Sequence, residues 1–283
     1  MRLFGIPEAQ HYCSSFTAIP GDAEKSLDVF KQKYLTSQRT LAEGTPLFDQ
    51  YRSCSLRDVE RHLFFAASHY RRCLDLMLPS GSPWAYVTIY YGCWFVSRAL
   101  LGMFGCTIFN KYVVDVNKNS PGNQGLSLRR IGNQPGQQQT TYNGGHQRYW
   151  DLFYRAVANL RPMVQPKFAA ILAPVGGNPI WQIDMRNLIN YDSWEGLSLS
   201  RNFQISFRQA TFPGSLPGIL RTQFGILEAL LELTFYFANQ FGFQTDALNI
   251  LGHTGSLSGS IRSLIYNGDP PGLVKKTIKS ALV

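Results

Sequence analysis

Cationic and aromatic side chains alternate over one stretch of the sequence, between residues 126 and 150. Arginine and histidine side chains can pair with phosphate groups, and the rings of Tyr142, Tyr149 and Trp150 can stack on bases. This combination is typical of single-stranded nucleic-acid binders. In a second interpretation, Tyr149 and Trp150 pack in the core through the face of their own helix. We predict a nucleic-acid-binding segment with the cations Arg129, Arg130, His146 and Arg148.

Motifs for metal and nucleotide chemistry are missing from the sequence. The five histidines show no ligand spacing with acidic or cysteine partners, and the five cysteines form no C-x-x-C pair. No P-loop, dinucleotide-binding or nucleophile-elbow motif occurs. Glu228 and Glu232 lie one helical turn apart, but without further ligands we expect a solvated or arginine-paired face there. We therefore predict no metal site and no cofactor.

Two predicted helices carry the clearest apolar pattern and must position the polar side chains. We expect Ser55 to cap the first helix, which has apolar residues at three- and four-residue spacing as far as Met77. The second runs from Ser82 to Gly105, with Pro83 in its first turn and Gly105 ending it in the left-handed conformation. Because the connection between them is short, we predict an antiparallel helical hairpin.

The second helix is apolar on almost every face, so we expect neighbouring elements to surround it. Gly92 in its middle predicts the close approach of another backbone. A membrane span is the rival interpretation, but Arg98 and the nearby prolines leave fewer than the ~20 apolar residues that a span needs. We therefore expect no membrane association.

The rest of the chain predicts an arm, strands and further helices. We expect an N-terminal arm over residues 1–54 and a mainly α-helical core over 55–283. Short β-branched runs between Gly, Asn and Pro predict strands within a small mixed α/β insertion at about 106–182. The smaller predicted elements are helices at 26–35, 146–160, 183–199 and 217–240, a strand at 204–212, and a short helix with a basic tail after residue 245.

The chain carries 27 Lys and Arg against 18 Asp and Glu, which gives a formal net charge of +9. An excess of positive charge favours polyanionic partners, so RNA or DNA is the first candidate and an acidic protein the alternative. The cysteine count is odd, and the N-terminal sequence has no apolar secretory signal. These features predict a cytoplasmic protein.

Three segments together resemble the HEPN superfamily, a helical-bundle group that includes toxin ribonucleases and many prokaryotic defence proteins. Residues 85–101 are similar to a family helix that reads A-Y-Y-A-x-F-x-A-A-R-A-L-L. The run RNLINYD at 186–192 resembles the family's R-N-x-x-x element, and a long apolar helix at 216–241 would complete the bundle. The resemblance implies a HEPN-like helical bundle that dimerises and lines an RNA cleft with its two R-N elements.

The resemblance also implies how such a cleft would work. Active members have a histidine a few residues after the arginine, which acts without metal on the ribose 2′-OH. Here Tyr191 follows Arg186 and Asn187 with no histidine in reach, and a tyrosine with a pKa near ~10 is a poor base. The resemblance therefore implies that Arg186, Asn187 and Tyr191 form a degenerate catalytic element. Arg98 would be a cation directed toward the same cleft.

The arginine-to-histidine form of the motif also occurs from Arg57 to His62, in the first long helix. Two interpretations fit: a working site, or an exposed first turn in which Asp58 and Glu60 complement the helix dipole.

Three functions remain open on the sequence. The preferred one is a nucleic-acid-associated or scaffold subunit of a prokaryotic anti-phage defence or toxin-type complex, with other subunits of that complex and a second copy of the chain as partners. A metal-independent endoribonuclease would combine Arg186 and Asn187 with a histidine from elsewhere. The third is a purely structural subunit that binds a protein partner. Candidate histidines for the ribonuclease are His62, His69 and His146.

Overall fold

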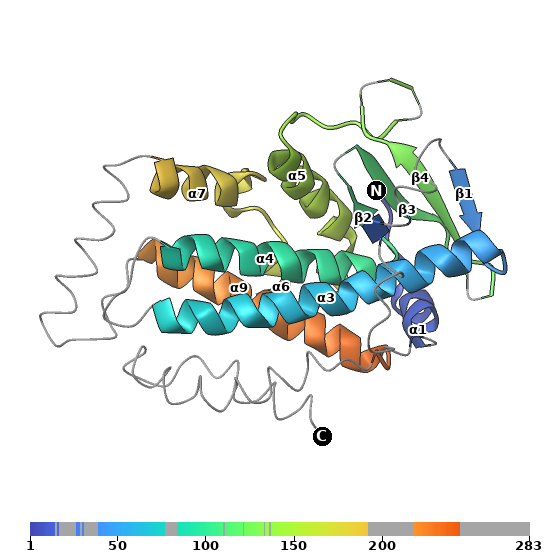
Figure 1. The fold of residues 1–283 in the computed structure, drawn as a ribbon, viewed down its shortest axis with the longest axis horizontal. Coiled ribbons are helices and arrows are strands. Elements are labelled where there is room, and N and C mark those ends of the chain that lie inside the picture. The colour runs from blue at the N-terminus through green and yellow to red at the C-terminus, as the bar shows by residue number, and fades with distance from the viewer. Residues whose placement is uncertain are drawn as a thin grey trace, which may run out of the picture. The chain divides into compact units, whose positions relative to one another are not determined.

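The computed structural model describes residues 1–243, apart from positions 15, 17–26, 29, 31–38, 77–83, 110, 121, 133, 136 and 192–217. It is mainly helical with a small antiparallel sheet, as the sequence predicts (Figure 1). The Ser82 cap, the strand at 204–212 and the elements after residue 245 lie outside the described residues, as does the predicted helix at 26–35 except for the helical residues Leu27, Asp28 and Phe30.

The chain divides into two compact units. Unit 1 comprises Met1–His62, Ser97–Ile180 and Phe237–Thr245. Unit 2 comprises Leu63–Val96, Trp181–Tyr236 and Asp246–Val283. Helix α3, Pro46–Leu76, and helix α4, Trp84–Met103, each contribute one part to unit 1 and one part to unit 2.

Helix α3 begins earlier than predicted. The Thr45 side-chain oxygen accepts a hydrogen bond from the Phe48 N–H at 3.3 Å, and Pro46 fills the first helical position, where no N–H is needed. The prediction that Ser55 caps this helix is wrong, because Ser55 lies inside α3 and is buried. The Thr45-Pro46 pair was the sequence signal for the true start.

Helix α4 ends as the sequence predicts. Gly105 has a φ of 73°, in the left-handed region. The N–H groups of Cys106 and Gly105 donate to the carbonyl oxygens of Leu101 and Gly102 at 2.9 and 3.1 Å. This pair of hydrogen bonds is the Schellman motif, which satisfies carbonyl groups that a helix end leaves unpaired.

The neighbour of Gly92 in unit 2 is a side chain and not the backbone that we predicted. A Cβ added at Gly92 would lie 2.9 Å from Leu227 Cδ2, and the next contact is with His69 Cβ at 3.6 Å. Leu227 belongs to helix α9, Gly218–Gln240. Because Gly92 has no side chain, Leu227 of α9 can pack against α4 at this position.

The two long helices form the predicted antiparallel hairpin. Within unit 2, the ring of Phe65 on α3 lies 5.1 Å from that of Phe95 on α4, and the ring of His69 on α3 lies 6.0 Å from that of Tyr91 on α4. The residue numbers of these contacts rise along α3 and fall along α4, so the two helices run in opposite directions. None of the helices in the described ranges combines the length and the apolar character that crossing a membrane requires.

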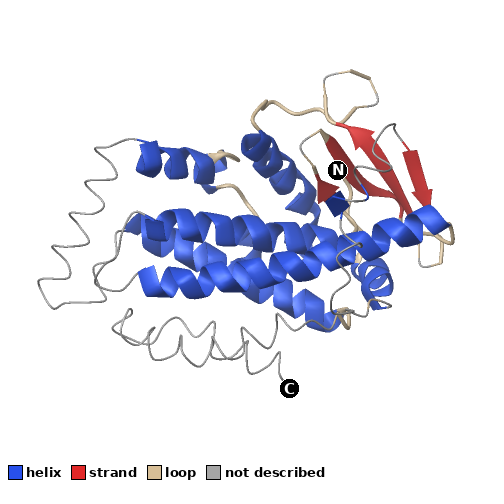
Figure 2. Ribbon diagram, in the orientation of Figure 1, coloured by secondary structure: helices blue, strands red, loops and turns tan. Residues whose placement is uncertain are grey.

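Unit 1 contains the sheet, whose described strands pair antiparallel in the order β1-β4-β3-β2 (Figure 2). Three of the strands confirm those predicted after residue 106. The fourth, β1, comes from the predicted arm, with Arg39 opposite Leu128 of β4. A four-residue strand with one buried side chain is too short to show a period. The strands are β1 (Arg39–Ala42), β2 (Thr107–Ile108), β3 (Tyr112–Lys118) and β4 (Gly125–Arg130).

The helices of unit 1 include α5, which confirms the predicted helix at 146–160. Tyr149 and Trp150 are buried on its inner face, so these rings pack in the core, as the second interpretation of the aromatic stretch predicted. Besides α5 (Gly145–Val157), the described short helices of this unit are α1 (Ile6–Ser14), η1 (Ala158–Met163), α6 (Pro166–Ile171) and η2 (Val175–Gly177).

Unit 2 joins its parts of α3 and α4 to helix α7, Trp181–Tyr191, and to most of α9. The ring of Tyr70 on α3 stacks on that of Phe224 on α9, with centroids 5.5 Å apart. Gln223 Nε2 lies 3.6 Å from Cys93 Sγ in the same core. These contacts confirm the predicted long apolar helix and its place against the hairpin.

Candidate functional site

The candidate site is a pocket in unit 1, between α3, the second half of α4, and α5. Its ionisable and aromatic lining consists of Asp58 and His62 from α3, Arg98 from α4 and Tyr149 from α5. We call this the polar pocket. Its empty volume is about 260 Å³, counted with the part that is open to solvent.

The register of the hairpin brings these residues together. Asp58 and His62 are four residues apart and therefore lie on one face of α3. Gly102 lets the two helices approach closely, since an added Cβ there would lie 2.5 Å from Val59 Cγ2. Arg98 precedes Gly102 by one helical turn on the antiparallel α4 and therefore lies beside His62 of α3. The sequence signal for this register was Gly102, a residue with no side chain inside an aromatic-rich helix.

Arg98 is positioned by a buried tyrosine. Its guanidinium carbon lies 6.0 Å from the centroid of the Tyr149 ring, at the outer range of a cation–π contact. The Tyr149 hydroxyl is hydrogen-bonded to Ser97 Oγ at 2.7 Å, and both residues are buried. A fixed ring therefore lies beneath the Arg98 side chain, which is itself partly exposed.

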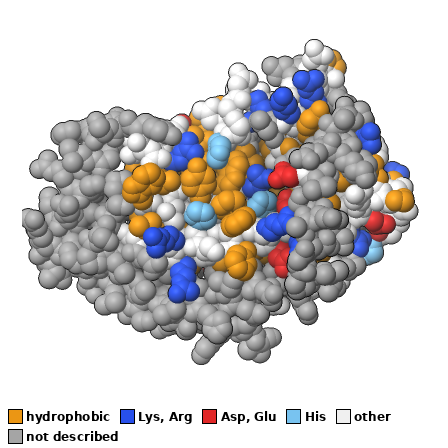
Figure 3. Space-filling model, in the orientation of Figure 1, with side chains coloured by type: hydrophobic (Ala, Val, Ile, Leu, Met, Phe, Trp, Pro, Cys, Tyr) orange, Lys and Arg blue, Asp and Glu red, His pale blue; other side chains and the backbone are white. Residues whose placement is uncertain are grey.

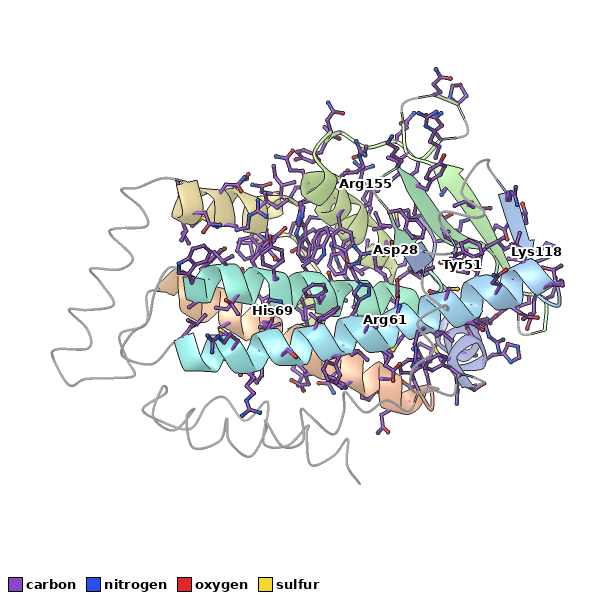
Figure 4. All side chains as sticks on the ribbon, viewed as in Figure 1. Asp28, Tyr51, Arg61, His69, Lys118 and Arg155 are labelled. Carbon is purple, nitrogen blue, oxygen red and sulfur yellow. The ribbon has the colours of Figure 1, made fainter. Side chains whose placement is uncertain are left out.

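Asp58 is a carboxyl group with an unusual proton affinity. Burial raises the pKa of Asp58 above its ordinary value, and the hydrogen bond and charge of Arg61 oppose this. Arg61 Nη1 donates to Asp58 Oδ1 at 2.9 Å, while the charge of Asp28 adds to the upward shift (Figure 4). Asp58 and His62 thus place a carboxyl of raised pKa and an imidazole on the same face of α3, and both group types can serve in acid–base chemistry.

The other four predicted nucleic-acid contacts lie outside the polar pocket. Arg129 forms a salt bridge with the buried Asp115 and also donates to Gln138 Oε1 at 3.1 Å. Arg148 donates to the Asn143 carbonyl at 2.9 Å. Arg129 and Arg148 therefore hold the insertion together in this structure. Of the remaining two, Arg130 is exposed at the end of β4, and His146 is partly exposed at the start of α5.

The predicted catalytic element lies in unit 2, on α7. Arg186 donates to its own neighbour, Asn187 Oδ1, at 3.2 Å from Nε and 2.7 Å from Nη2. Its guanidinium carbon also lies 5.0 Å from the ring centroid of the buried Tyr90. Tyr191 ends the helix, and its side chain lies outside the described residues. The structure thus brings Arg186 and Asn187 together and anchors the arginine on α4.

The Arg57–His62 motif is divided between two environments. Arg57 forms a partly buried ion pair with Glu60 of the same helix and is absent from the pocket lining, whereas His62 lines the pocket. The cation beside His62 is therefore Arg98, from the neighbouring helix. Sequence reasoning placed these two residues in separate hypotheses, because their proximity depends on the hairpin register.

The carboxylates of α9 lie on a partly buried face of that helix. Glu228 Oε1 accepts a hydrogen bond from the Tyr70 hydroxyl at 2.9 Å, and Glu232 is buried. The solvated face that we expected as one alternative is therefore wrong for Glu232. Within the described residues, no group of three or more His, Cys, Asp and Glu side chains is arranged to hold a metal ion.

Cysteine chemistry is disfavoured by burial. All five cysteines are free thiols in the interior. Burial raises the pKa of Cys13 and Cys93 far above the ordinary thiol value, and it does the same for Cys73 and Cys106. Since the thiolate is the reactive form, none of these side chains is a suitable nucleophile at neutral pH.

No family model, curated protein or solved structure matches this chain. The HEPN resemblance therefore remains a prediction that depends on the three segments quoted above. The functional argument then depends on the geometry of the polar pocket.

Proposed function

We propose that this protein is a HEPN-like, nucleic-acid-associated subunit of a prokaryotic anti-phage defence or toxin-type complex. It would act in the cytoplasm with other subunits, and the polar pocket would contact the backbone of RNA or DNA. The observation that supports the proposal is the meeting of Arg98 with His62 and Tyr149 in one pocket of a chain with a net charge of +9. A phosphate group is the ligand that the partly exposed guanidinium of Arg98 favours.

Charge removal at the pocket tests the proposal. We expect Arg98→Gln to weaken binding of a fluorescein-labelled RNA about tenfold, and to reduce the slope of log affinity against log salt by about one phosphate contact. Fluorescence anisotropy at several salt concentrations measures both quantities. Arg98→Lys should keep most of the affinity, because it keeps the charge.

Lys118→Gln is the matched control. Lys118 is an exposed residue of unit 1 at the end of β3, away from the pocket lining, and its loss changes the net charge by the same amount (Figure 4). If Lys118→Gln weakens binding as much as Arg98→Gln, the effect belongs to net charge and the pocket has no special role. If neither RNA nor DNA binds even at low salt, the proposal fails in favour of a purely structural subunit.

A second candidate, a metal-independent endoribonuclease, is favoured by one observation. His62 and Asp58, whose pKa is raised by burial, line the same pocket as Arg98. The imidazole could take the proton of a ribose 2′-OH as its oxygen attacks the adjacent phosphorus, and a protonated carboxyl could give a proton to the 5′-oxygen that leaves. The guanidinium could stabilise the extra negative charge on the phosphate during this step.

RNA cleavage in the presence of EDTA tests this second candidate. We expect cleavage that survives chelation and disappears in His62→Ala, with Arg186→Ala still active because Arg186 belongs to unit 2. Loss of cleavage in Arg186→Ala with retention in His62→Ala would instead place the chemistry at the R-N element. If the wild-type protein does not cleave the RNA, the endoribonuclease candidate fails and only the binding function remains.

A further inference from the structure

Unit 2 carries a row of four aromatic rings that come alternately from α3 and α4. We call it the ring row, and it runs in the order Phe65, Phe95, His69 and Tyr91. Successive ring centroids lie 5.1, 5.4 and 6.0 Å apart, and His69 is stacked on both of its neighbours. Phe65 and His69 are four residues apart on α3, as are Tyr91 and Phe95 on α4, so the antiparallel hairpin interleaves the two pairs.

The row ends at a ring that is open to solvent. Phe65 is 48% exposed, and its neighbour Phe64 is 45% exposed. An apolar core helix would bury such side chains, and two adjacent exposed phenylalanines commonly mark an interaction surface. Figure 3 shows hydrophobic side chains beside those of histidine and of lysine or arginine over α3 and α4.

Cations follow the phenylalanines along the solvent face of α3. Ser68 lies one turn after Phe64 and Phe65, and Arg71 and Arg72 lie two turns after them; all three are exposed. This face of α3 therefore presents rings at one end and guanidinium groups at the other. The side chain of Asp75, one turn further, lies outside the described residues.

The histidine in the row behaves as a neutral aromatic ring. Burial lowers the pKa of His69 below its ordinary value, so its imidazole is uncharged at pH 7. His69 lies between α3 and α4, in contact with both ring partners on α4 (Figure 4). The ring row thus extends from the half-buried Tyr91 to the exposed Phe65, whose ring is tilted by 42° against that of Phe95.

We propose that the ring row is a stacking site for the unpaired bases of single-stranded nucleic acid, with Arg71 and Arg72 on the phosphate backbone. The inference depends on the proposed nucleic-acid function and adds the class of ligand, since only unpaired bases offer a free π-face. A base that stacks on the exposed Phe65 would extend the row of rings, and base–aromatic stacking is how sequence-tolerant single-strand binders gain affinity. An acidic protein surface would satisfy the arginines but would not use the rings.

Binding of three labelled 12-nucleotide probes tests the inference. One is single-stranded RNA, the second is the same strand in a duplex, and the third carries abasic sites, so that it keeps the phosphates and lacks the bases. We expect the wild-type protein to prefer the intact single strand. We expect Phe65→Ala to weaken that binding roughly tenfold, which is about the value of one base stack, and to leave binding of the abasic probe unchanged.

Two variants control for folding and for loss of an exposed ring. Phe65→Tyr keeps a stacking face and should restore binding. Tyr236→Ala removes an equally exposed ring, 52% exposed, from α9 in the same unit and should bind like the wild type. The inference is overturned if Phe65→Ala binds the single strand normally, if the duplex is preferred, or if Phe65→Ala alters only the oligomeric state measured by light scattering. Because Arg98→Gln acts through unit 1, failure of the ring row alone leaves the proposed function standing.

Discussion

Glu43 shows how a single residue makes the stability of unit 1 depend on pH. Its Oε1 lies 2.7 Å from His11 Nε2, and its Oε2 accepts the Gln124 N–H at 2.6 Å. Burial raises the pKa of Glu43, but these hydrogen bonds and the charge of His11 outweigh it, so the pKa lies below the ordinary value. A carboxyl of lowered pKa stabilises the fold above its unfolded pKa, and this stability is lost as pH falls through the folded pKa.

Glu43→Gln should therefore destabilise the protein at pH 6 by about 1 kcal/mol, and the loss should be smaller at pH 3, because the wild-type side chain loses its charge as pH falls through its lowered pKa. Urea denaturation at the two pH values measures the difference. Glu60→Gln is the control, because it removes a helical ion pair worth no more than about 0.5 kcal/mol. An equal loss at both pH values for Glu43→Gln would show that its charge has no role.

Arg129 was predicted from its residue type to bind nucleic acid, and its contact with Asp115 provides a test of a structural role. Asp115 is 3% exposed, so removing the arginine leaves a buried carboxylate without its ionic partner. We expect Arg129→Gln to lower the free energy of unfolding by about 3 kcal/mol. Arg130→Gln, at the exposed next position, should change it by less than about 0.5 kcal/mol in the same urea titration. Equal stability of the two variants would contradict the structural role.

At the scale of the elements, helix ends and strand pairing were predictable to different degrees. Gly105 marked the end of α4 because a left-handed residue closes a Schellman motif with local hydrogen bonds. The start of α3 was missed because the apolar period becomes clear only after Ser55, whereas the helix begins at Pro46. Strand β1 was missed because its hydrogen bonds go to β4, far along the chain.

Two glycines in helices should respond to alanine in opposite ways. Gly102→Ala forces a Cβ to within 2.5 Å of the Val59 side chain, whose χ1 is stiff, so we expect a loss of about 1–3 kcal/mol. Gly225→Ala on α9 meets no atom within 4 Å and should gain about 0.5–1 kcal/mol from helix propensity. Thermal unfolding followed by circular dichroism compares the two.

The double variant Val59→Ala with Gly102→Ala should recover part of the loss if the clash is its cause. A stabilising Gly102→Ala would contradict the close approach that positions Arg98. Because Gly102 sets the hairpin register at the polar pocket, the same variants should also change nucleic-acid affinity in parallel with stability.

At the scale of the whole molecule, the positive charge predicts salt-dependent binding. With a net charge of +9, we expect RNA affinity to fall at least about tenfold between 50 and 200 mM salt, because several counterions are released from the backbone. Anisotropy titrations over this range measure the slope. Affinity that does not change with salt would contradict a phosphate-binding role for both the polar pocket and the face of Arg71 and Arg72.

By itself, the sequence determined the long helices, the end of α4, the strands after residue 106 and the positive charge. These follow from local periodicity, from glycine's access to the left-handed region and from composition, which need no knowledge of distant contacts. Only the tertiary structure decided that Arg98 joins His62, that Arg129 joins Asp115, and that Phe65 ends an exposed ring row. Each of those pairings depends on the register between two elements, which buried side chains such as Val59 set and which a linear pattern does not contain.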